Sequence, residues 1–215
     1  IKSLGIFSIG KNLSNAIING DVAEMAIKTI GNIEKRSSFH SIPMKDIFDV
    51  EYWSLEQAKL KKQTLPLSGM VTVVTGGSGV IGFATAEKFK QMGSEVIIVD
   101  FNKKKINKKD ISKHFETYLC DVRERTGFKK VLDRICKKYG GLDFVISNAG
   151  TAFQHEIATI ADRDLIQSFQ INFFAHQIVA SESIEIMKKQ KMEGCLLFNI
   201  SKQSVNPGMN FGAYG

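Results

Sequence analysis

A glycine-rich segment, VTVVTGGSGVIG, joins an apolar run to an amphipathic stretch at residues 71–82. Glycines let a backbone turn sharply and approach a pyrophosphate without a Cβ clash. The N-terminus of a following helix adds free N–H groups and a partial positive charge. The spacing Gly77-x-Gly79-x-x-Gly82 matches the dinucleotide fingerprint, with the preceding strand and following helix that the fingerprint requires. The segment therefore predicts a pyrophosphate-binding loop.

An acidic residue, Asp100, ends the next apolar run. A carboxylate at this position accepts hydrogen bonds from an adenosine ribose diol and repels a 2′-phosphate. It predicts NAD as the cofactor in preference to NADP, and the positive charge of the nearby Lys103–Lys105 would weaken that preference. The alternative interpretation of the whole motif is a glycine turn that only packs a helix on a sheet.

The elements that must position these groups alternate between apolar runs and amphipathic stretches. Strands that are apolar throughout, each followed by a helix, imply a parallel sheet covered on both faces with right-handed crossovers. The predicted fold class is α/β, a Rossmann-like doubly wound parallel sheet in three αβα layers, incomplete at its C-terminal edge. The predicted strands are 70–75, 95–100, 117–120, 142–147 and 195–200. The predicted helices are 79–92, with Ile81, Ala84, Phe89 and Met92 as its apolar stripe, 125–139, and 162–190 as one helix or two abutting ones.

The N-terminal part of the chain has a different character. The segment Leu4–Ile9 predicts a short strand. Residues 14–33 have apolar residues at helical spacing, and Gly20 is an expected break in that helix. A second helix is predicted within 49–62. The predicted organisation is a small helical segment at 1–62, a linker at 63–69 and an NAD(P)-binding domain at 70–215.

Composition limits the classes of function. The 215 residues are 43% hydrophobic and 24% charged, which is typical of a globular protein of one or two domains. We expect no membrane partner, because no apolar run approaches the length of a membrane helix. The net charge is +7, but the lysine clusters lack an aromatic platform, so we interpret them as solvated surface and expect no nucleic acid partner. Three cysteines without metal spacing indicate reduced thiols and a cytoplasmic location.

Several motifs together resemble the short-chain dehydrogenase/reductase superfamily. In family order, they are TGGSGVIG (75–82), CDV (120–122), SNAG (147–150), INF (171–173) and NIS…AYG (199–215). One departure is Val80, which stands where the shorter members have the middle glycine of TGxxxGxG. The loop spacing instead fits the TGxxGxxG of extended members, whereas SNAG resembles the shorter type. The resemblance covers residues 70–215 and leaves both subfamilies open.

The region around Phe48–Leu60 shows a narrower resemblance. It is similar to the junction in bifunctional proteins that join a class II aldolase domain to a short-chain dehydrogenase. The N-terminal segment is then expected to be the remnant of an aldolase-like domain. In that family upstream histidines hold the aldolase metal, but this chain has no HxH pair, and we assign no metal to any of its histidines. They are His40, His114, His155 and His176.

The resemblance also implies a catalytic set. Tyr214 is the expected acid/base, which moves a proton on the substrate oxygen, and Ser201 is expected to hold that oxygen. Ser204 is the competing serine. Asn172 lies on an apolar helical stripe, where a polar side chain needs a partner. It is either part of a water-linked proton relay or a structural hydrogen-bonding residue.

The expected cofactor site combines the glycine loop with the ends of the second, third and fourth strands. Asp121 and Val122 are expected to flank the adenine, and Asn148 to tie neighbouring strands together beside the cofactor. The full set is Gly76, Gly77, Ser78, Gly79, Val80, Ile81, Gly82, Asp100, Phe101, Asp121, Val122, Asn148, Ala149 and Gly150.

The predicted function is hydride transfer between NAD and a small alcohol or carbonyl compound. By resemblance, the substrate class is a sugar, a sugar alcohol or a hydroxy-aldehyde. The family's lysine, four residues after the tyrosine, would follow Gly215, the last residue given. We therefore expect little turnover from this polypeptide and, from its open sheet edge, a homo-oligomer. Two alternatives stay open: an extended-type epimerase or dehydratase, and a non-catalytic dinucleotide-binding module.

Overall fold

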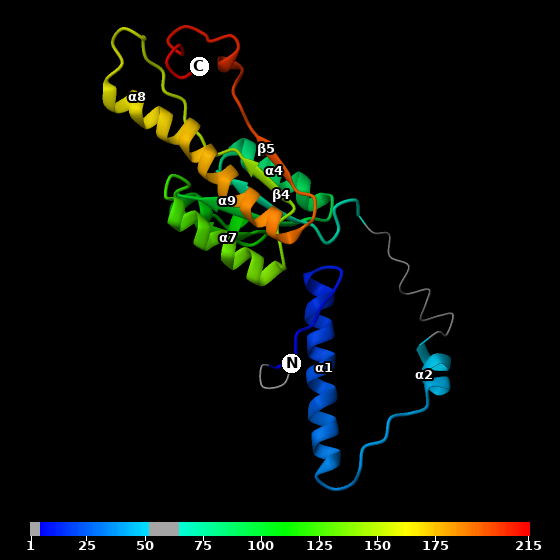
Figure 1. The fold of residues 1–215 in the computed structure, drawn as a ribbon. Helices are drawn as coiled ribbons and strands as arrows, with labels where there is room; N and C mark the ends of the chain where they lie inside the picture. Colours follow the sequence, from blue (N-terminus) through cyan, green and yellow to red (C-terminus); the bar gives the residue numbers. More distant parts are fainter. Residues whose placement is uncertain (1–4, 52–64) are drawn as a thin grey trace. The chain divides into compact units, whose positions relative to one another are not determined.

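The structure is a computed structural model that describes residues 5–51 and 65–215. The chain divides into two units, Ile1–Pro66 and Leu67–Gly215. In the first unit, α1 spans Leu13–Glu34 and α2 spans Met44–Glu51 (Figure 1). No helix in the described part of the chain combines the length and the apolar character needed to cross a bilayer.

Helix α1 is continuous through Gly20, so the predicted break at this residue is wrong. A glycine inside a helix costs about 1 kcal/mol relative to alanine, which a helix of 22 residues can tolerate. The site also favours a small residue, because a Cβ on Gly20 would lie 3.1 Å from the Ser8 hydroxyl. At the start of the helix, the Asn12 side chain caps it by accepting a hydrogen bond from the Asn15 amide.

Two further expectations concern the N-terminal unit. The strand predicted for Leu4–Ile9 is wrong over its described part, since residues 5–9 are irregular. A strand needs a neighbour to pair its backbone groups, and all the strands that the structure describes pair within Leu67–Gly215. The first residues of the helix predicted within 49–62 belong to α2, and the rest lie outside the described residues.

The Leu67–Gly215 unit contains a parallel sheet, whose strands β4 and β5 are labelled in Figure 1. The strand order is β3-β2-β1-β4-β5. The predicted α/β fold class is therefore confirmed, with helices between the successive strands. The strands are β1 Val71–Thr75, β2 Glu95–Asp100, β3 Glu116–Leu119, β4 Phe144–Ser147 and β5 Cys195–Phe198. The helices are α4 Val80–Gln91, α5 Lys103–Ile106, α6 Lys109–Ser112, α7 Arg125–Tyr139, α8 Asp162–Phe169 and α9 Ala175–Gln190.

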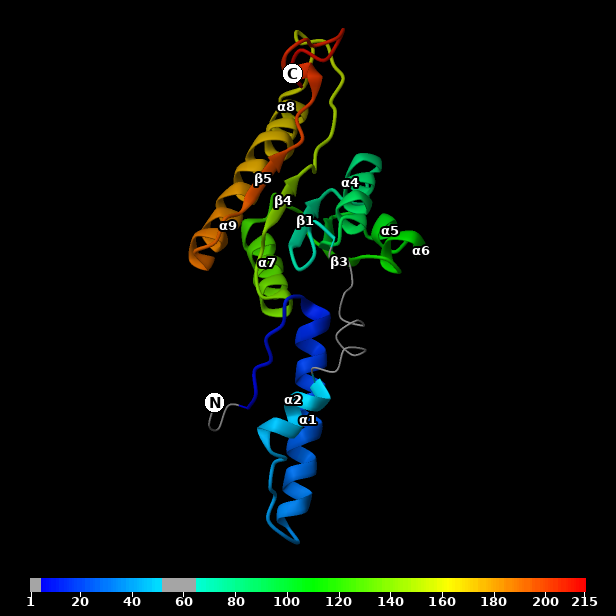
Figure 2. The ribbon, with the colours of Figure 1, turned by 90° about the vertical axis from the view of Figure 1, so that its right-hand side faces the viewer.

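The sheet buries side chains on both faces, as its continuous apolar runs predicted. Successive side chains of a strand alternate between faces, so the neighbours Val73 and Val74 enter different apolar clusters. Helices α7 and α9 cover one face, and α4 covers the other (Figure 2). The first cluster includes Val71, Val73, Ile97, Val99, Phe128, Leu132, Ile135, Val145 and Val179, and the second includes Val74, Ala86, Val96, Ile98, Ile111, Phe115 and Ile146.

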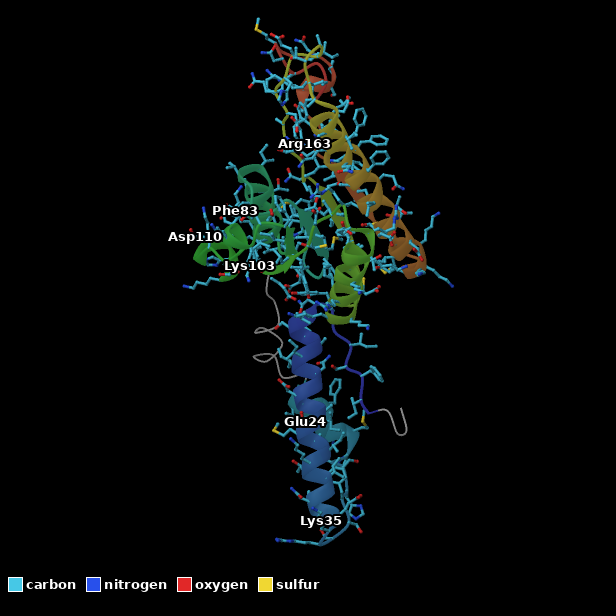
Figure 3. All side chains as sticks on the ribbon, turned by 90° about the vertical axis from the view of Figure 1, so that its left-hand side faces the viewer. Glu24, Lys35, Phe83, Lys103, Asp110 and Arg163 are labelled. Atoms are coloured by element: carbon cyan, nitrogen blue, oxygen red, sulfur yellow. The ribbon has the colours of Figure 1, made fainter. Side chains whose placement is uncertain are left out.

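Helix α4 faces the sheet with only part of the predicted stripe: Phe89 packs against the second apolar cluster, as predicted. Gly82 is buried, and the Phe83 ring lies edge-on to the Phe115 ring with centroids 5.8 Å apart. Phe83 is labelled in Figure 3. The predicted burial of Ile81 and Ala84 is wrong, because both are exposed. The small Gly82 lets that side of the helix approach the loop before it, and this leaves the Ile81 side chain 64% exposed.

The stretch 162–190 is helical throughout, but its geometry changes in the middle. A π-helical turn, Gln170–Phe174, joins α8 to α9. Such turns occur frequently at functional sites. This one contains Asn172, which the sequence singled out as a polar residue on an apolar stripe.

Candidate functional site

A cleft of about 980 Å³ opens at the carboxyl ends of the strands in the Leu67–Gly215 unit. The adjacent strands β1 and β4 are separated in sequence by β2 and β3, so the strand order reverses between them. Open α/β sheets bind ligands beyond the strand ends at such a reversal. All the residues predicted for the catalytic and cofactor sets line this cleft except Gly77 and Ser78.

The glycine loop supplies one wall of the cleft. Gly76 has a positive φ of 63°, and a Cβ there would lie 2.8 Å from the Cα of Ala149. A Cβ on Gly82 would lie 2.8 Å from Nδ2 of Asn148. Both positions therefore need glycine for the loop to lie against the segment after β4. Gly77 is buried instead, with its Cα facing the Ile98 side chain.

The N-terminus of α4 opens into this wall. Gly79 is its N-cap residue and provides no side-chain cap. The first helical hydrogen bond runs from Phe83 N to Gly79 O at 2.8 Å, so the amides of Val80, Ile81 and Gly82 precede it. Uncapped amides and the helix dipole together favour an anionic group at this end.

Asp100 anchors the same loop from the end of β2. Its Oδ2 accepts hydrogen bonds from the Ser78 hydroxyl at 2.5 Å and the Ser78 amide at 3.1 Å, and its Oδ1 accepts one from the Asn102 amide at 3.0 Å. A carboxylate has about four acceptor sites, so one site on Oδ1 is left. Ser78 thus acts on the cleft through Asp100, although it does not line the cleft itself.

Three strand ends are tied together beside the loop. The Thr75 hydroxyl accepts hydrogen bonds from the amides of Asn148 at 3.0 Å and Ala149 at 3.2 Å. Nδ2 of Asn148 donates to Thr75 O at 3.1 Å. Asn199, just after β5, donates from Nδ2 to Oδ1 of Asn148 at 2.8 Å. These bonds join the ends of β1, β4 and β5 and fix the floor of the cleft.

The Asn172 side chain holds the segment that follows β4. Its Oδ1 accepts a hydrogen bond from Thr151 N at 3.0 Å, and its Nδ2 donates to Thr151 O at 2.9 Å and to the Ser168 hydroxyl at 3.2 Å. Both amide protons are therefore engaged. Of the two roles considered for this residue, the side-chain contacts fit the structural one.

Ser201 and Tyr214 both line the cleft and are half-buried. Ser201 caps a short 3₁₀ turn, and its Oγ accepts from Gln203 N at 3.2 Å. The Ser204 hydroxyl donates its proton to the Ser201 carbonyl oxygen at 2.8 Å, so this proton is already hydrogen-bonded. No acceptor for the Ser201 hydroxyl proton, and no partner for the Tyr214 hydroxyl, is found in the described part of the chain. The Ser201 hydroxyl is thus the freer donor of the two serines.

The ends of β2 and β3 border the cleft with one apolar and one charged group. Phe101 is 65% exposed and lines the cleft. The Asp121 carboxylate accepts hydrogen bonds from the Arg123 guanidinium at 2.6 and 3.0 Å, and these hold the pKa of that carboxyl below its usual range. Val122 also lines the cleft but is only 5% exposed, as part of the first apolar cluster. Burial raises the pKa of the neighbouring Cys120 thiol, which keeps it neutral.

Sequence reasoning missed several cleft residues. Asn199 lies inside the NIS motif, where only the serine was considered. His176 follows Asn172 by one helical turn, and that spacing was the signal that could have placed it in the cleft. Other lining residues that were not predicted are Val99, Asn102, Lys105, Cys120, Thr151, Ala152, Ile171, Phe173, Gln177, Ala180, Phe198, Ile200 and Gly215.

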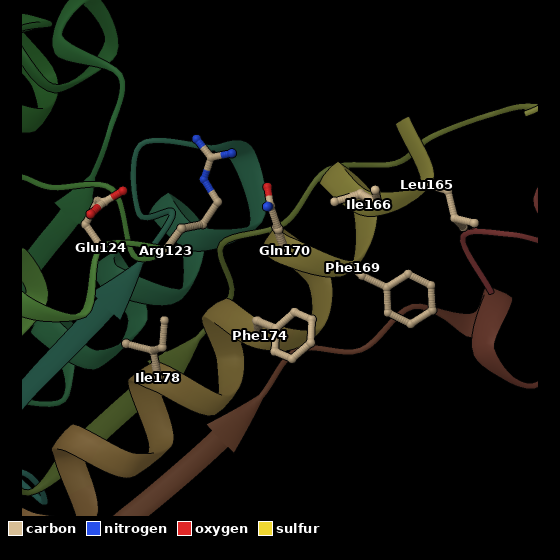
Figure 4. A pocket seen from close by; sticks show the side chains of 8 residues that line it. All are labelled: Arg123, Glu124, Leu165, Ile166, Phe169, Gln170, Phe174 and Ile178. Carbon is tan, nitrogen blue, oxygen red and sulfur yellow. The ribbon is translucent and has the colours of Figure 1, made fainter. Parts of the chain in front are cut away.

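A second cavity, of about 630 Å³, lies along α8 and α9 (Figure 4). It contains none of the predicted site residues, and most of its wall is apolar. Its lining residues are Arg123, Glu124, Leu165, Ile166, Phe169, Gln170, Phe174 and Ile178. Among residues 5–51 and 65–215, no group of three or more His, Cys, Asp or Glu side chains is arranged to hold a metal ion.

Two family models match different parts of the chain. The family model "short chain dehydrogenase" matches residues 70–215, and the model "Aldolase class II, second domain" matches residues 1–60. The uncharacterized oxidoreductase YuxG of Bacillus subtilis is 28% identical over 223 residues, which cover 100% of this chain and 32% of that protein. Short chain aldehyde dehydrogenase 1 of Euphorbia lathyris is 32% identical over 148 residues, or 64% of this chain and 50% of that protein. The chain thus spans between about a third and a half of the length of these relatives.

Solved structures with the same fold include two dehydrogenases. The NAD⁺-bound xylitol dehydrogenase has a TM-score of 0.65 at 25% identity, covering 70% of this chain and 60% of that one. The ligand-free aldohexose dehydrogenase of Thermoplasma acidophilum has a TM-score of 0.63 at 25% identity, covering 71% of this chain and 57% of that one.

Proposed function

The chain belongs to the short-chain dehydrogenase family through residues 70–215, and from this premise we propose an oxidoreductase that transfers hydride between a nicotinamide dinucleotide and a small alcohol or carbonyl compound. One observation carries the proposal: the glycine loop, Asp100 and the hydroxyls of Ser201 and Tyr214 all border one cleft. The chain covers only 32% and 50% of the length of these two relatives, so the activity of the whole protein is likewise a proposal.

The cleft fits a dinucleotide. Gly76 and Gly82 let the loop pack closely against the segment after β4, where a Cβ on either residue would collide with Ala149 or Asn148. The uncapped start of α4 then faces the space that a diphosphate would fill. Phe101 offers an apolar surface at the end of β2, where an adenine could stack. When bound, the nicotinamide ring supplies the hydride acceptor or donor.

The polar residues near β5 divide the proton chemistry between them. Ser201 would hold the substrate oxygen, since its hydroxyl proton has no acceptor in the described part of the chain. Tyr214 would give or take the proton on that oxygen as hydride moves. Asn172 would keep the Thr151 segment in place beside them. We assign this last residue a positioning role.

We further propose NAD in preference to NADP. The Asp100 carboxylate has one acceptor site for a ribose hydroxyl and would repel a 2′-phosphate. Lys105 lines the same end of the cleft, so its charge would offset part of that repulsion. A sugar or sugar alcohol is the proposed substrate class, which is supported by the names of the xylitol and aldohexose dehydrogenases among the structural neighbours.

Titration with NADH, followed by its fluorescence, tests the cofactor part of the proposal. Gly82→Ala puts a methyl group against Asn148 and should weaken NADH binding about tenfold or more, which corresponds to about 1.4 kcal/mol. Gly31→Ala is the matched control, because a Cβ there meets no atom within 4 Å. Failure of the unaltered chain to bind either NADH or NADPH at about 1 mM would overturn the proposal.

Turnover tests the catalytic part. NADH formation from a panel of sugars and sugar alcohols should fall when Tyr214 is replaced by Phe, while NADH affinity stays unchanged. Since little turnover is expected of this polypeptide, dinucleotide binding without turnover would favour the non-catalytic module only if a protein with the full length of its relatives also lacked activity.

A further inference from the structure

His176 on α9 is a cleft residue that the proposed chemistry does not use. It is half-buried, and its ring lies 6.1 Å from the ring of Phe198, centroid to centroid. Its Nδ1 is 2.6 Å from the hydroxyl oxygen of Ser147, the last residue of β4. A helix and a strand thus share one short side-chain hydrogen bond directly beneath the cleft.

The direction of this hydrogen bond follows from burial. Ser147 is 1% exposed, and within the described residues Nδ1 of His176 is the only hydrogen-bond partner of its hydroxyl. A buried hydroxyl proton without an acceptor costs about 1–3 kcal/mol. If Nδ1 carried the proton, the Ser147 proton would be left in that state. The hydroxyl therefore donates, Nδ1 accepts, and the ring proton is on Nε2.

The imidazole is also kept neutral. Burial lowers the pKa of His176, and no carboxylate within the described residues pairs with its ring. A neutral ring with an occupied Nδ1 offers one remaining polar group, the Nε2–H donor. The two ring nitrogens diverge, so Nε2 faces away from Ser147. No acceptor for it is found in residues 5–51 or 65–215, although the ring lines the cleft.

The surroundings indicate which half of a dinucleotide this donor would meet. His176 lies one helical turn after Asn172 and beside Phe198 of β5. The cleft residues that follow β5 include Ser201, on the proposed catalytic side. The adenosine side, with Asp100 and the glycine loop, is at β1 and β2.

We propose that His176 is a cofactor-binding residue whose Nε2–H donates a hydrogen bond to an uncharged oxygen on the nicotinamide half of the dinucleotide. Ser147 is the positioning residue that fixes the tautomer of the ring. This inference rests on the proposed function and adds a contact on the side of the cleft away from the glycine loop.

Binding of two ligands separates this contact from the rest of the site. ADP carries only the adenosine and diphosphate parts, whereas NADH carries the nicotinamide half as well. Calorimetric titration of His176→Phe should show NADH affinity reduced about five- to tenfold, the size of one net hydrogen bond, with ADP affinity unchanged. His176→Gln, which keeps an N–H donor near the same place, should recover part of the loss. His114→Phe, which removes an exposed imidazole, is the matched control.

Each outcome has a distinct meaning. Equal loss of ADP and NADH affinity in His176→Phe would overturn the inference, because it indicates a disturbed cleft and not a lost contact. Unchanged NADH affinity in that variant would overturn it as well, while leaving the proposed function intact. If the unaltered chain binds neither ligand, it is the proposed function that fails.

The tautomer is tested independently by nitrogen-15 NMR of the histidine rings. The unaltered protein should show His176 as the neutral Nε2–H tautomer, and Ser147→Ala should shift it toward a mixture of tautomers. Observation of the Nδ1–H tautomer in the unaltered protein would overturn the inference.

Discussion

The Asp100 carboxylate and Ser78 are joined by two hydrogen bonds to one oxygen: Oδ2 accepts the Ser78 hydroxyl at 2.5 Å and the Ser78 amide at 3.1 Å. The residue expected to read the ribose therefore also holds the glycine loop. This pairing links the two sequence signals that predicted a dinucleotide. In the proposed function, cofactor preference and loop position therefore depend on the same carboxylate.

The charge of Asp100 should decide cofactor preference. Asp100→Asn keeps an acceptor for Ser78 but removes the negative charge that repels a 2′-phosphate. We expect the ratio of NADH to NADPH affinity to fall about tenfold, or about 1.4 kcal/mol. Fluorescence titration with both cofactors measures this ratio. Asp110→Asn, an exposed carboxylate on α6, removes the same charge and should leave the ratio unchanged; an unchanged ratio in Asp100→Asn would contradict the prediction.

Gln190, the last residue of α9, is hydrogen-bonded to the segment just before β4. Its Oε1 accepts from Leu142 N at 2.8 Å, and its Nε2 donates to Leu142 O at 3.0 Å. Gln190→Leu leaves both backbone groups without partners and should reduce the free energy of unfolding by about 2 kcal/mol. Urea denaturation measures the loss. Gln91→Leu, on an exposed position at the end of α4, is the control, and equal effects of the two changes would argue against a specific role for this pair.

Ser183 should be replaceable with a gain in stability. Its hydroxyl is fully buried and has no hydrogen-bond partner in the described part of the structure. Ser183→Ala removes this unpaired group and should raise the free energy of unfolding by about 1 kcal/mol. Thermal denaturation measures the change. On the same helix Ser181 accepts a hydrogen bond from Arg125, so Ser181→Ala should not stabilise, and a loss in Ser183→Ala would show that its hydroxyl has a partner.

The stability of the sheet edge should depend on pH through Glu116. Partial burial raises the pKa of this carboxyl, but hydrogen bonds from Lys138, Tyr139 and Tyr118 outweigh that effect and hold it below its usual value of 4.5. A carboxyl whose pKa is lowered by folding stabilises the folded protein at pH values above the pKa of the unfolded state. This stability is lost as the pH falls through the pKa of the folded state. Glu116→Gln should therefore be less stable than the unaltered protein at pH near 7.

Denaturation midpoints of the two proteins, measured from neutral pH down to about pH 3, check this prediction. The difference in stability should shrink as the pH falls below 4.5. A difference that stays constant over the whole range would show that the carboxylate charge contributes nothing. Glu193→Gln, at an exposed position, should show no such change with pH.

The sheet was predictable because its signal is local. The three central strands β1, β2 and β4 are short runs of mainly apolar or β-branched residues, and burial on both faces of a parallel sheet demands such a run. The helix of residues 125–139 was predicted with its observed bounds for a similar reason, since one face must bury Phe128, Leu132 and Ile135. Local signals failed at residues 5–9, which are irregular although their sequence predicted a strand, and at Gly20, which a continuous helix tolerates.

The sequence by itself determined the class of fold, the position of the glycine loop and the identity of the polar residues at the strand ends. These depend on residue type and spacing along the chain, which periodicity and backbone freedom make readable. Only the tertiary structure decided which of these groups are already engaged: Ser78 with Asp100, Asn172 with Thr151, and Ser147 with His176. The partners are 22, 21 and 29 residues apart in sequence, so spacing alone does not pair them. A hydrogen bond depends on the distance and direction between two groups, and folding sets both.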